Sequence, residues 1–270
     1  MFELCTKSSL PGWVIMWCLA LAIYVGLKAV SWVSVRMEAP AWKHVAYLLG
    51  WPGMDTVHFL AGHASRPLVS EWLFASFKMG LGVVLIWIVV PLIRGNDLLA
   101  GWVGMIGIVF ILHFGLFHLL SCWWRSLGMA AIPIMNWPIV ATSVAEFWGR
   151  RWNLAFRDLT HRFLFVPLVR RIGAVGALLT GFLISGLIHD LVISVPACGG
   201  WGGPTCFFVL QGLGVLLERS KLGRKAGLGR GVAGYLLCIC VILLPSPLLF
   251  HRPFVERVIL PFLAVIGARS

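Results

Sequence analysis

The sequence contains few charged residues. Asp, Glu, Lys and Arg make up 12% of its 270 residues, and only 10 residues are acidic, whereas a soluble domain carries about 25% charged residues. The sequence also has no HExxH, Walker A, G-x-G-x-x-G or G-x-S-x-G pattern, so zinc-protease, nucleotide-loop and serine-hydrolase chemistry find no support. This composition excludes a soluble globular domain.

Long apolar runs take the place of charge. Hydrophobic residues make up 60% of the chain, which includes 14 Trp, and the mean hydropathy is +0.92. A helix needs about 20 apolar residues to cross a bilayer, and the runs predict spans at residues 11–33, 73–93, 99–120, 172–195, 204–217, 232–249 and 258–266. Because the short alternating segments of a barrel are missing, we expect an all-α polytopic membrane protein with about six to seven transmembrane helices.

Basic residues are unevenly distributed along the chain. Lys and Arg number 22 against 10 Asp and Glu, which gives a net charge of +12, and the segments 121–171 and 218–231 are rich in them. Such residues gather in cytosolic loops, so we expect a non-cytosolic N-terminus, cytosolic basic loops and no nucleic-acid partner. We predict one membrane-embedded domain, residues 1–270, in a bacterial inner membrane or an endoplasmic reticulum membrane, with N-terminal helices in 1–142 and the motifs in 143–270.

The segment between residues 148 and 163 is amphipathic when it is read as a helix. Its apolar and polar faces are formed, respectively, by Trp148, Trp152, Phe156, Leu159 and Phe163 and by Arg150, Asn153, Arg157 and His161. Such a helix is typical of the membrane interface. Its basic face either anchors the protein to anionic lipids or binds phosphate, which arginine recognises through bidentate hydrogen bonds.

His189 and Asp190 interrupt the apolar run 172–195. Ionisable residues are costly inside a membrane and usually face a cavity, a partner or a water path, so His189 is the strongest functional candidate, as a general base. The alternative is a buried histidine whose ring is satisfied by a backbone carbonyl. Gly181, Ser185 and His189 are spaced by four residues, which lets a helix or a substrate approach the imidazole closely.

The other histidines do not define a metal site. His113 and His118 lie five residues apart, a spacing that does not place both on one metal ion. We expect them to pack or to form hydrogen bonds between helices, and we predict no metal centre.

Two motifs in the second half of the chain resemble one family of enzymes. They are Glu146-Phe147-Trp148-Gly149-Arg150-Arg151-Trp152-Asn153 and, on the next predicted helix, Ser185-Gly186-Leu187-Ile188-His189-Asp190. In this order they are similar to the wax synthase-like branch of the membrane-bound O-acyltransferases, as is the later stretch from Phe207 to Gly212 followed by Glu218. The resemblance covers the chain from Ser143 onward.

The resemblance implies transfer of an acyl group from acyl-CoA to the hydroxyl of a hydrophobic alcohol, in a tunnel through the membrane and without a permanently bound cofactor. It matches His189 to the family's histidine and Asn153 to its polar partner. The residue chemistry is compatible, because a neutral imidazole takes the proton of an attacking alcohol and an amide NH₂ donates to a developing oxyanion. The sequence departs from the family at Asp190, where Glu is usual, and at Gln211, where His is common.

The remaining candidates are expected to contact acyl-CoA or the alcohol. Basic side chains would hold the phosphates, and residues in and near the motifs would contact the rest of the substrates. They are Trp148, Arg150, Arg151, Trp152, Arg157, Ser185, Asp190, Gln211, Glu218, Lys221 and Arg224. The alternative function is a membrane transporter or lipid-binding protein in which His189 and Asp190 form a proton relay, although inverted repeats and paired half-helices are not evident.

Overall fold

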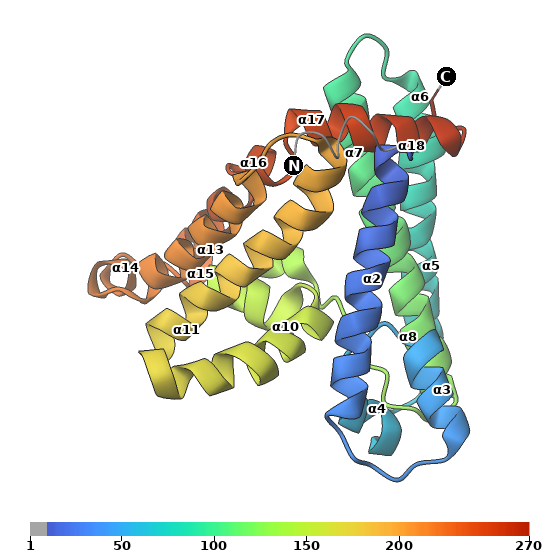
Figure 1. The fold of residues 1–270 in the computed structure, drawn as a ribbon, viewed down its shortest axis with the longest axis vertical. Helices are drawn as coiled ribbons and strands as arrows, with labels where there is room; N and C mark the ends of the chain where they lie inside the picture. Colours follow the sequence, from blue (N-terminus) through green and yellow to red (C-terminus); the bar gives the residue numbers. More distant parts are fainter. Residues whose placement is uncertain (1–9, 270) are drawn as a thin grey trace.

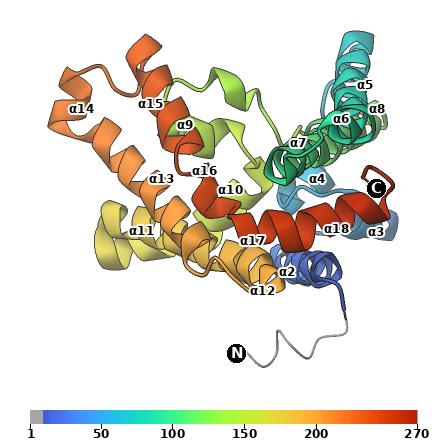
Figure 2. The same cartoon turned by 90° about the horizontal axis from the view of Figure 1, so that it is seen from above.

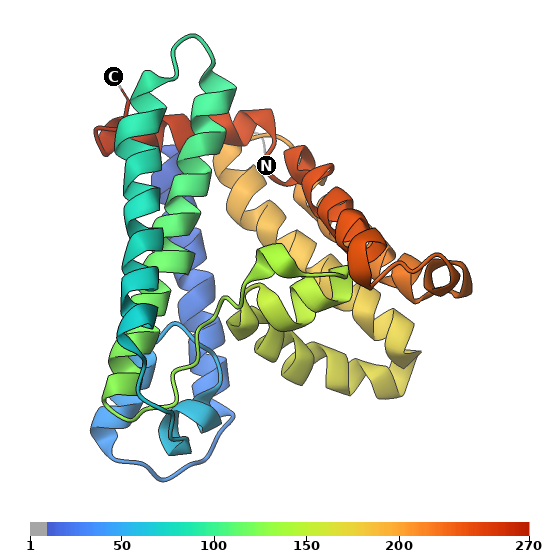
Figure 3. The same ribbon diagram turned by 180° about the vertical axis from the view of Figure 1, so that it is seen from behind.

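The computed structural model describes residues 10–269, and within this range every regular element is a helix. The predicted all-α class is therefore confirmed. The helices form two groups that meet at one end of the molecule and diverge toward the other (Figures 1 and 3). One group is an upright bundle from the first half of the chain, and the other is inclined and carries both motifs.

The upright bundle contains three long helical segments that alternate in direction (Figure 1). The first is α2 (Gly12–Val33), and two short helices, α3 (Ala41–Gly50) and α4 (Thr56–Ala61), follow it at the lower end. The other two segments form a hairpin, and each contains a π-helical stretch. They consist of α5 (Val69–Val84), η1 (Leu85–Val89) and α6 (Val90–Leu92), and of α7 (Asp97–Val109), η2 (Phe110–Leu116) and α8 (Phe117–Ser126).

The inclined group begins after a long connection that contains the 3₁₀ turn η3 (Pro138–Val140). Its first part comprises α9 (Val144–Glu146), η4 (Phe147–Arg151), α10 (Leu154–Thr160), η5 (His161–Phe165), α11 (Val166–His189), η6 (Asp190–Ser194) and α12 (Val195–Ala197). Its second part comprises α13 (Gly203–Arg219), α14 (Lys221–Lys225), α15 (Gly231–Leu243) and α16 (Ser246–Leu249). The final helical segment, made of α17 (Arg252–Phe254), η7 (Val255–Ile259) and α18 (Leu260–Val265), crosses the upper end of the bundle (Figure 2).

Five helical segments of the described range are long and apolar enough to cross a membrane. They are Gly12–Val33, Val69–Leu92, Asp97–Ser126, Leu154–Ala197 and Gly231–Leu249, and each overlaps a predicted span. Two further predicted spans are not among these five segments. Residues 204–217 lie in α13, which has only 17 residues, and residues 258–266 lie in the crossing segment. The chain is thus a polytopic membrane protein with fewer long spans than the six or seven predicted.

The predicted amphipathic helix is present, but it is broken. Asn153 adopts φ 42° and ψ 63°, the left-handed conformation, and separates η4 from α10; asparagine tolerates this conformation better than most residues. A second break lies at Gly173, where φ is 73° and ψ is 171°, values that glycine reaches without steric cost. This break interrupts α11 (Figure 1), which turns from the lower arm of the inclined group into its long rising part.

Three clusters of buried apolar residues stabilise this arrangement. The first joins α7, η6, α13 and the crossing segment, and it includes Ala100, Ile193, Phe207, Val255 and Leu263. The second joins the lower end of the bundle to α10 and includes Tyr47, Phe59, Trp124 and Leu159. The third packs α9 against α13 and α15 through Ala141, Val144, Val215 and Cys238. The first motif is therefore fixed by contacts with both helix groups.

Candidate functional site

Asn153 caps α10 and keeps a free hydrogen-bond donor. Its Oδ1 accepts from the backbone N–H of Phe156 at 3.2 Å, which satisfies one of the unpaired donors at the start of the helix. Because this N–H needs an acceptor, the amide oxygen faces Phe156, and Nδ2 is the group that remains. Within residues 10–269, Nδ2 forms no hydrogen bond. The half-buried side chain of Asn153 can therefore donate to a bound molecule.

An ion pair shapes the segment that precedes α10. Glu146 accepts from the backbone N–H of Thr142 at 2.8 Å and pairs with Nε and Nη2 of Arg151 at 2.7 and 2.6 Å. Nη1 of Arg151 donates to the carbonyls of Asn136 and Trp137 at 3.3 and 3.2 Å. Burial would raise the pKa of Glu146, but the hydrogen bonds and the ion pair outweigh burial and lower this pKa below its usual value. The guanidinium of Arg151 is thus occupied by a carboxylate and two backbone carbonyls of the protein.

Helix α13 supports the same segment through two buried polar side chains. Glu218 accepts from the first two backbone N–H groups of α9, that of Val144 at 2.8 Å and the next at 3.0 Å. Gln211 is fully buried; its Oε1 accepts from Nε1 of Trp148 at 3.3 Å, and its Nε2 donates to the carbonyl of Val241 at 2.8 Å. Glu218 therefore connects α13 to the start of α9, and Gln211 connects it to the first motif.

A continuous series of aromatic rings joins the two motifs. The centroid of the His189 ring lies 4.4 Å from that of Phe208, and the centroid of the Phe208 ring lies 5.5 Å from that of Trp148. The ring centroids of Trp148 and Phe147 are 5.1 Å apart, and Phe147 stacks on Trp152 with a centroid distance of 5.5 Å. Since Trp152 directly precedes the N-cap of α10, the structure links His189 to Asn153 through packed rings, although the two residues come from different elements.

The hydrogen bond of His189 defines its tautomer. Nδ1 lies 2.7 Å from the backbone carbonyl of Ser185, and because a carbonyl only accepts, Nδ1 carries the proton of the neutral ring. Nε2 then has a free lone pair, and it contacts no donor among the described residues. The hydroxyl of Ser185 itself donates to the carbonyl of Gly181 at 2.8 Å. The carbonyl expected as the structural alternative is present, and it leaves the second nitrogen available for chemistry.

The carboxylate of Asp190 is occupied by hydrogen bonds within the protein. It accepts from Oγ of Ser194 at 2.8 Å, from the backbone N–H groups of Gly202 and Thr205 at 2.9 and 3.0 Å, and from Oγ1 of Thr205. A Cβ on Gly186 would stand 2.6 Å from Cα of Thr205, so the absence of a side chain there allows α11 and α13 to approach. Asp190 therefore fastens the start of α13 to α11.

A relay of polar groups, not expected from the sequence, extends from Asp190. Nδ1 of the buried residue His251 accepts from the backbone N–H of Phe254 at 3.2 Å. Its Nε2 therefore carries the proton and donates to Oγ of Ser194 at 3.3 Å, which in turn donates to Asp190. Burial lowers the pKa of His251. The relay joins η6 to the start of the crossing segment.

The basic candidates do not converge on one point. Arg150 is exposed on η4, and Arg157 forms an ion pair with Asp158 at 3.1 Å. Lys221 and Arg224 are exposed on α14, beyond the end of α13. Arg150, Lys221 and Arg224 are thus accessible to an anion, whereas Arg157 is partly neutralised by its neighbour.

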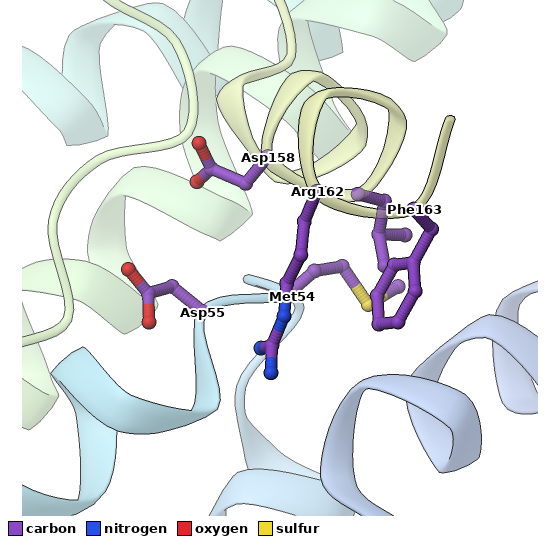
Figure 4. Close-up of a pocket in the computed structure, with 6 residues that line it drawn as sticks. Met54, Asp55, Asp158, Arg162 and Phe163 are labelled. Carbon is purple, nitrogen blue, oxygen red and sulfur yellow. The ribbon is translucent and has the colours of Figure 1, made fainter. Parts of the chain in front are cut away.

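A separate cavity of about 170 Å³ lies between α10–η5 and the segment before α4. Figure 4 shows the carboxylates of Asp55 and Asp158 on one side of the Arg162 side chain, and Nη2 of Arg162 donates to the carbonyl of Ser34 at 3.3 Å. Two carboxylates beside one guanidinium do not favour a phosphate group. The lining residues are Met54, Asp55, Asp158, Leu159, Arg162 and Phe163.

A second polar cluster, which the sequence did not indicate, lies between α5 and α8. Nζ of Lys78 is 2.7 Å from Nδ1 of His118, Nε2 of His118 is 3.3 Å from Glu71, and Glu71 also pairs with Arg125. Because an ammonium only donates, Nδ1 of His118 accepts and Nε2 donates. Donor atoms of Glu71, His118 and Cys122 lie within 4.8 Å of one another, but both ring nitrogens already have partners. The cluster joins the two helices, as predicted for His118.

Comparison with known proteins shows what part of this chain is similar to. Residues 131–210 match the sequence profile described as the membrane bound O-acyl transferase family. The chain is 35% identical over 124 residues to the long-chain-alcohol O-fatty-acyltransferase of Simmondsia chinensis, a match that covers 41% of this chain and 35% of that protein. It is 39% identical over 111 residues to the probable long-chain-alcohol O-fatty-acyltransferase 8 of Arabidopsis thaliana, covering 35% and 31% of the two chains.

A protein named for a sterol acceptor is also similar. The acyl-CoA–sterol O-acyltransferase 1 of Arabidopsis thaliana is 33% identical over 67 residues, which cover 22% of this chain and 19% of that protein. The chain spans about a third of the length of the long-chain-alcohol relatives that it matches. Fold and site thus define an all-helical, polytopic membrane protein whose motifs surround a histidine. Within residues 131–210 the chain is similar to the membrane bound O-acyl transferase family, and its similar proteins include long-chain-alcohol O-fatty-acyltransferases.

Proposed function

We propose that this protein is an acyl-CoA-dependent O-acyltransferase that esterifies a hydrophobic, membrane-soluble alcohol. The observation that carries the proposal is the hydrogen bond from Nδ1 of His189 to the carbonyl of Ser185. It leaves Nε2 unprotonated, as a general base requires. The similar proteins are named for long-chain alcohols or sterols. These names support an alcohol as the acceptor of the acyl group.

In the proposed reaction, the hydroxyl of the alcohol donates its proton to Nε2 of His189 while its oxygen attacks the carbonyl carbon of the thioester. Nδ2 of Asn153 donates a hydrogen bond to the oxyanion of the tetrahedral intermediate. When the intermediate collapses, the carbon–sulfur bond breaks, and the imidazolium returns the proton to the departing thiolate. The products are the ester and free CoA, and no cofactor takes part.

The remaining candidates support these two residues in different ways. Trp148 and Trp152 belong to the ring series between the motifs and keep the reacting groups away from water. Arg151, Gln211 and Glu218 position the first motif. Asp190 holds α11 against the start of α13.

The phosphates of acyl-CoA are proposed to bind the exposed basic residues. Arg150, Lys221 and Arg224 are accessible, and guanidinium groups recognise phosphate through paired hydrogen bonds. Arg157 contributes less because Asp158 neutralises part of its charge. These loops lie in the cytosol, where acyl-CoA is dissolved, if basic loops stay inside and the N-terminus lies outside.

A proton relay through His189 and Asp190 is the alternative that the sequence raised. The carboxylate of Asp190 is occupied by Ser194, Gly202 and Thr205, and no observation favours a relay between the two neighbours. We therefore propose the transferase alone.

The proposal is tested by product analysis. Purified protein in lipid nanodiscs receives palmitoyl-CoA and hexadecanol, and a sterol in parallel. We expect free thiol and the matching ester to appear together in equal amounts. Thiol release without ester would indicate hydrolysis, and the absence of both products with every alcohol would refute the transferase function.

A further inference from the structure

His113 is a half-buried histidine whose Nδ1 atom is buried and unsatisfied. It lies on the π-helical segment η2, and its buried Nδ1 has no hydrogen-bond partner among residues 10–269. More than about nine in ten buried polar groups are paired in native proteins, and an unpaired one costs about 1–3 kcal/mol. The other histidines of the long helices differ, because His118 and His189 both form hydrogen bonds.

The surroundings of His113 are aromatic. Its ring stacks on Trp152 with a centroid distance of 6.5 Å and an angle of 15°, and it meets Phe117 edge-on at 5.3 Å. Phe114 contacts the same Trp152 at 6.2 Å. These three side chains offer no group to Nδ1, since the indole of Trp152 stacks on the ring face. The described part of the protein thus supplies no partner for Nδ1, which leaves this nitrogen able to bind a molecule in the site.

The position of His113 indicates which substrate that is. Trp152, on which it stacks, directly precedes Asn153, the proposed partner of the thioester. His113 thus lies beside the part of the site where Asn153 is proposed to meet the thioester.

The chemistry of the imidazole specifies the group. A neutral imidazole has one accepting and one donating nitrogen, and it pairs well with an amide, which has both a donor and an acceptor. The pantetheine arm of acyl-CoA carries amides close to the thioester sulfur, whereas a fatty alcohol has no polar group beyond its reacting hydroxyl. An amide of the arm therefore fits the unpaired nitrogen.

We propose that His113 binds an amide of the pantetheine arm and so selects acyl-CoA over simple thioesters. This inference rests on the proposed function. His113 acts on donor recognition and touches neither the alcohol nor the proton transfer. It adds a residue of the first helix group to a site whose other members lie in the inclined group.

The test compares two donors with the same acyl group. One is the palmitoyl thioester of N-acetylcysteamine, which contains the amide nearest to sulfur, and the other is an S-butyl thioester, which contains none. We expect the wild type to show a higher kcat/KM with the amide-bearing donor. His113→Phe, which keeps a ring to stack on Trp152, should reduce the ratio of the two kcat/KM values about tenfold, the typical worth of one hydrogen bond.

Two controls separate binding from a structural role. Phe117→Leu changes the packing around the same ring and should leave the donor ratio as in the wild type. His113→Phe should not lower the melting temperature, because it removes an unpaired polar atom from an aromatic site. The KM for the alcohol should be the same in the wild type and in His113→Phe.

The possible outcomes are distinguishable. An unchanged donor ratio in His113→Phe, or an effect on the KM of the alcohol alone, would overturn this inference and leave the transferase function standing. A wild type that releases no thiol from either donor or from acyl-CoA would refute both proposals. A tenfold lower ratio with an intact melting temperature supports the assignment.

Discussion

Three histidines of the membrane-spanning helices differ in what their ring nitrogens contact. His118 has partners on both nitrogens, Lys78 and Glu71, and it fits a structural role. His189 has one partner, a carbonyl that fixes the proton on Nδ1. His113 has a buried nitrogen with no partner in the described range. A histidine is available for chemistry only when one of its ring nitrogens has no partner in the protein. The residue type alone does not reveal which histidines meet this condition.

The amide of Asn153 gives the first prediction at the residue scale. We expect Asn153→Ala to lower kcat by about 10²–10³, because it removes Nδ2, the proposed oxyanion donor. The same substitution also removes the Oδ1 cap of α10. Asn153→Asp serves as the matched variant, because it retains an oxygen for the cap but has no NH₂. Its kcat should be nearly as low as that of Asn153→Ala. Its melting temperature should lie closer to that of the wild type than that of Asn153→Ala does. Full activity of Asn153→Asp would show that only the cap matters.

At the scale of elements, the spans were predictable and the breaks were not. Apolar runs near 20 residues located the long helices because hydropathy is a local property. The helical wheel over residues 148–163 assumed an uninterrupted helix and missed the left-handed Asn153. The contacts of Arg151 and Glu218 come from residues distant in sequence or outside regular helices, so spacing could not reveal that these two candidates position the motif.

The junction between α11 and α13 gives a prediction at this scale. Asp190→Asn leaves one oxygen to accept from Ser194, Gly202 and Thr205, and it places an NH₂ against their donors. We expect a loss of about 1–3 kcal/mol of stability, seen as a lower melting temperature, with turnover per folded molecule largely retained. Asp97→Asn, which alters an exposed ion pair with Arg269, should change the melting temperature little.

A proton relay would give the reverse pattern for Asp190→Asn. Turnover would be abolished while the melting temperature stayed at the wild-type value. That result would return the relay hypothesis to consideration.

At the scale of the whole molecule, the two helix groups divide the proposed work. The inclined group supplies His189 and Asn153, and the upright bundle supplies the helix against which Trp152 packs. The crossing segment joins the groups at one end through the first apolar cluster. Sequence similarity to known transferases is concentrated in the inclined group, so the bundle is where substrate recognition specific to this chain is expected.

The distribution of charge predicts the orientation in the membrane. We expect a cysteine introduced at Lys225 to be labelled by a membrane-impermeant maleimide only from the cytosolic side, and a cysteine at Arg94 only from the other side, because basic loops stay in the cytosol. Both variants are made in a background without other cysteines. Labelling of both positions from the same side would contradict the proposed topology.

The most direct test of the proposed mechanism compares two histidine substitutions in one assay. The initial rate of thiol release from palmitoyl-CoA with hexadecanol is measured for purified His189→Gln and for His161→Gln, which alters an exposed histidine on η5. Loss of a general base typically costs about 10²–10⁴ in rate, so His189→Gln should fall by at least a hundredfold while His161→Gln and both melting temperatures remain near wild type. Equal rates for the two variants would contradict the assignment of His189 as the base.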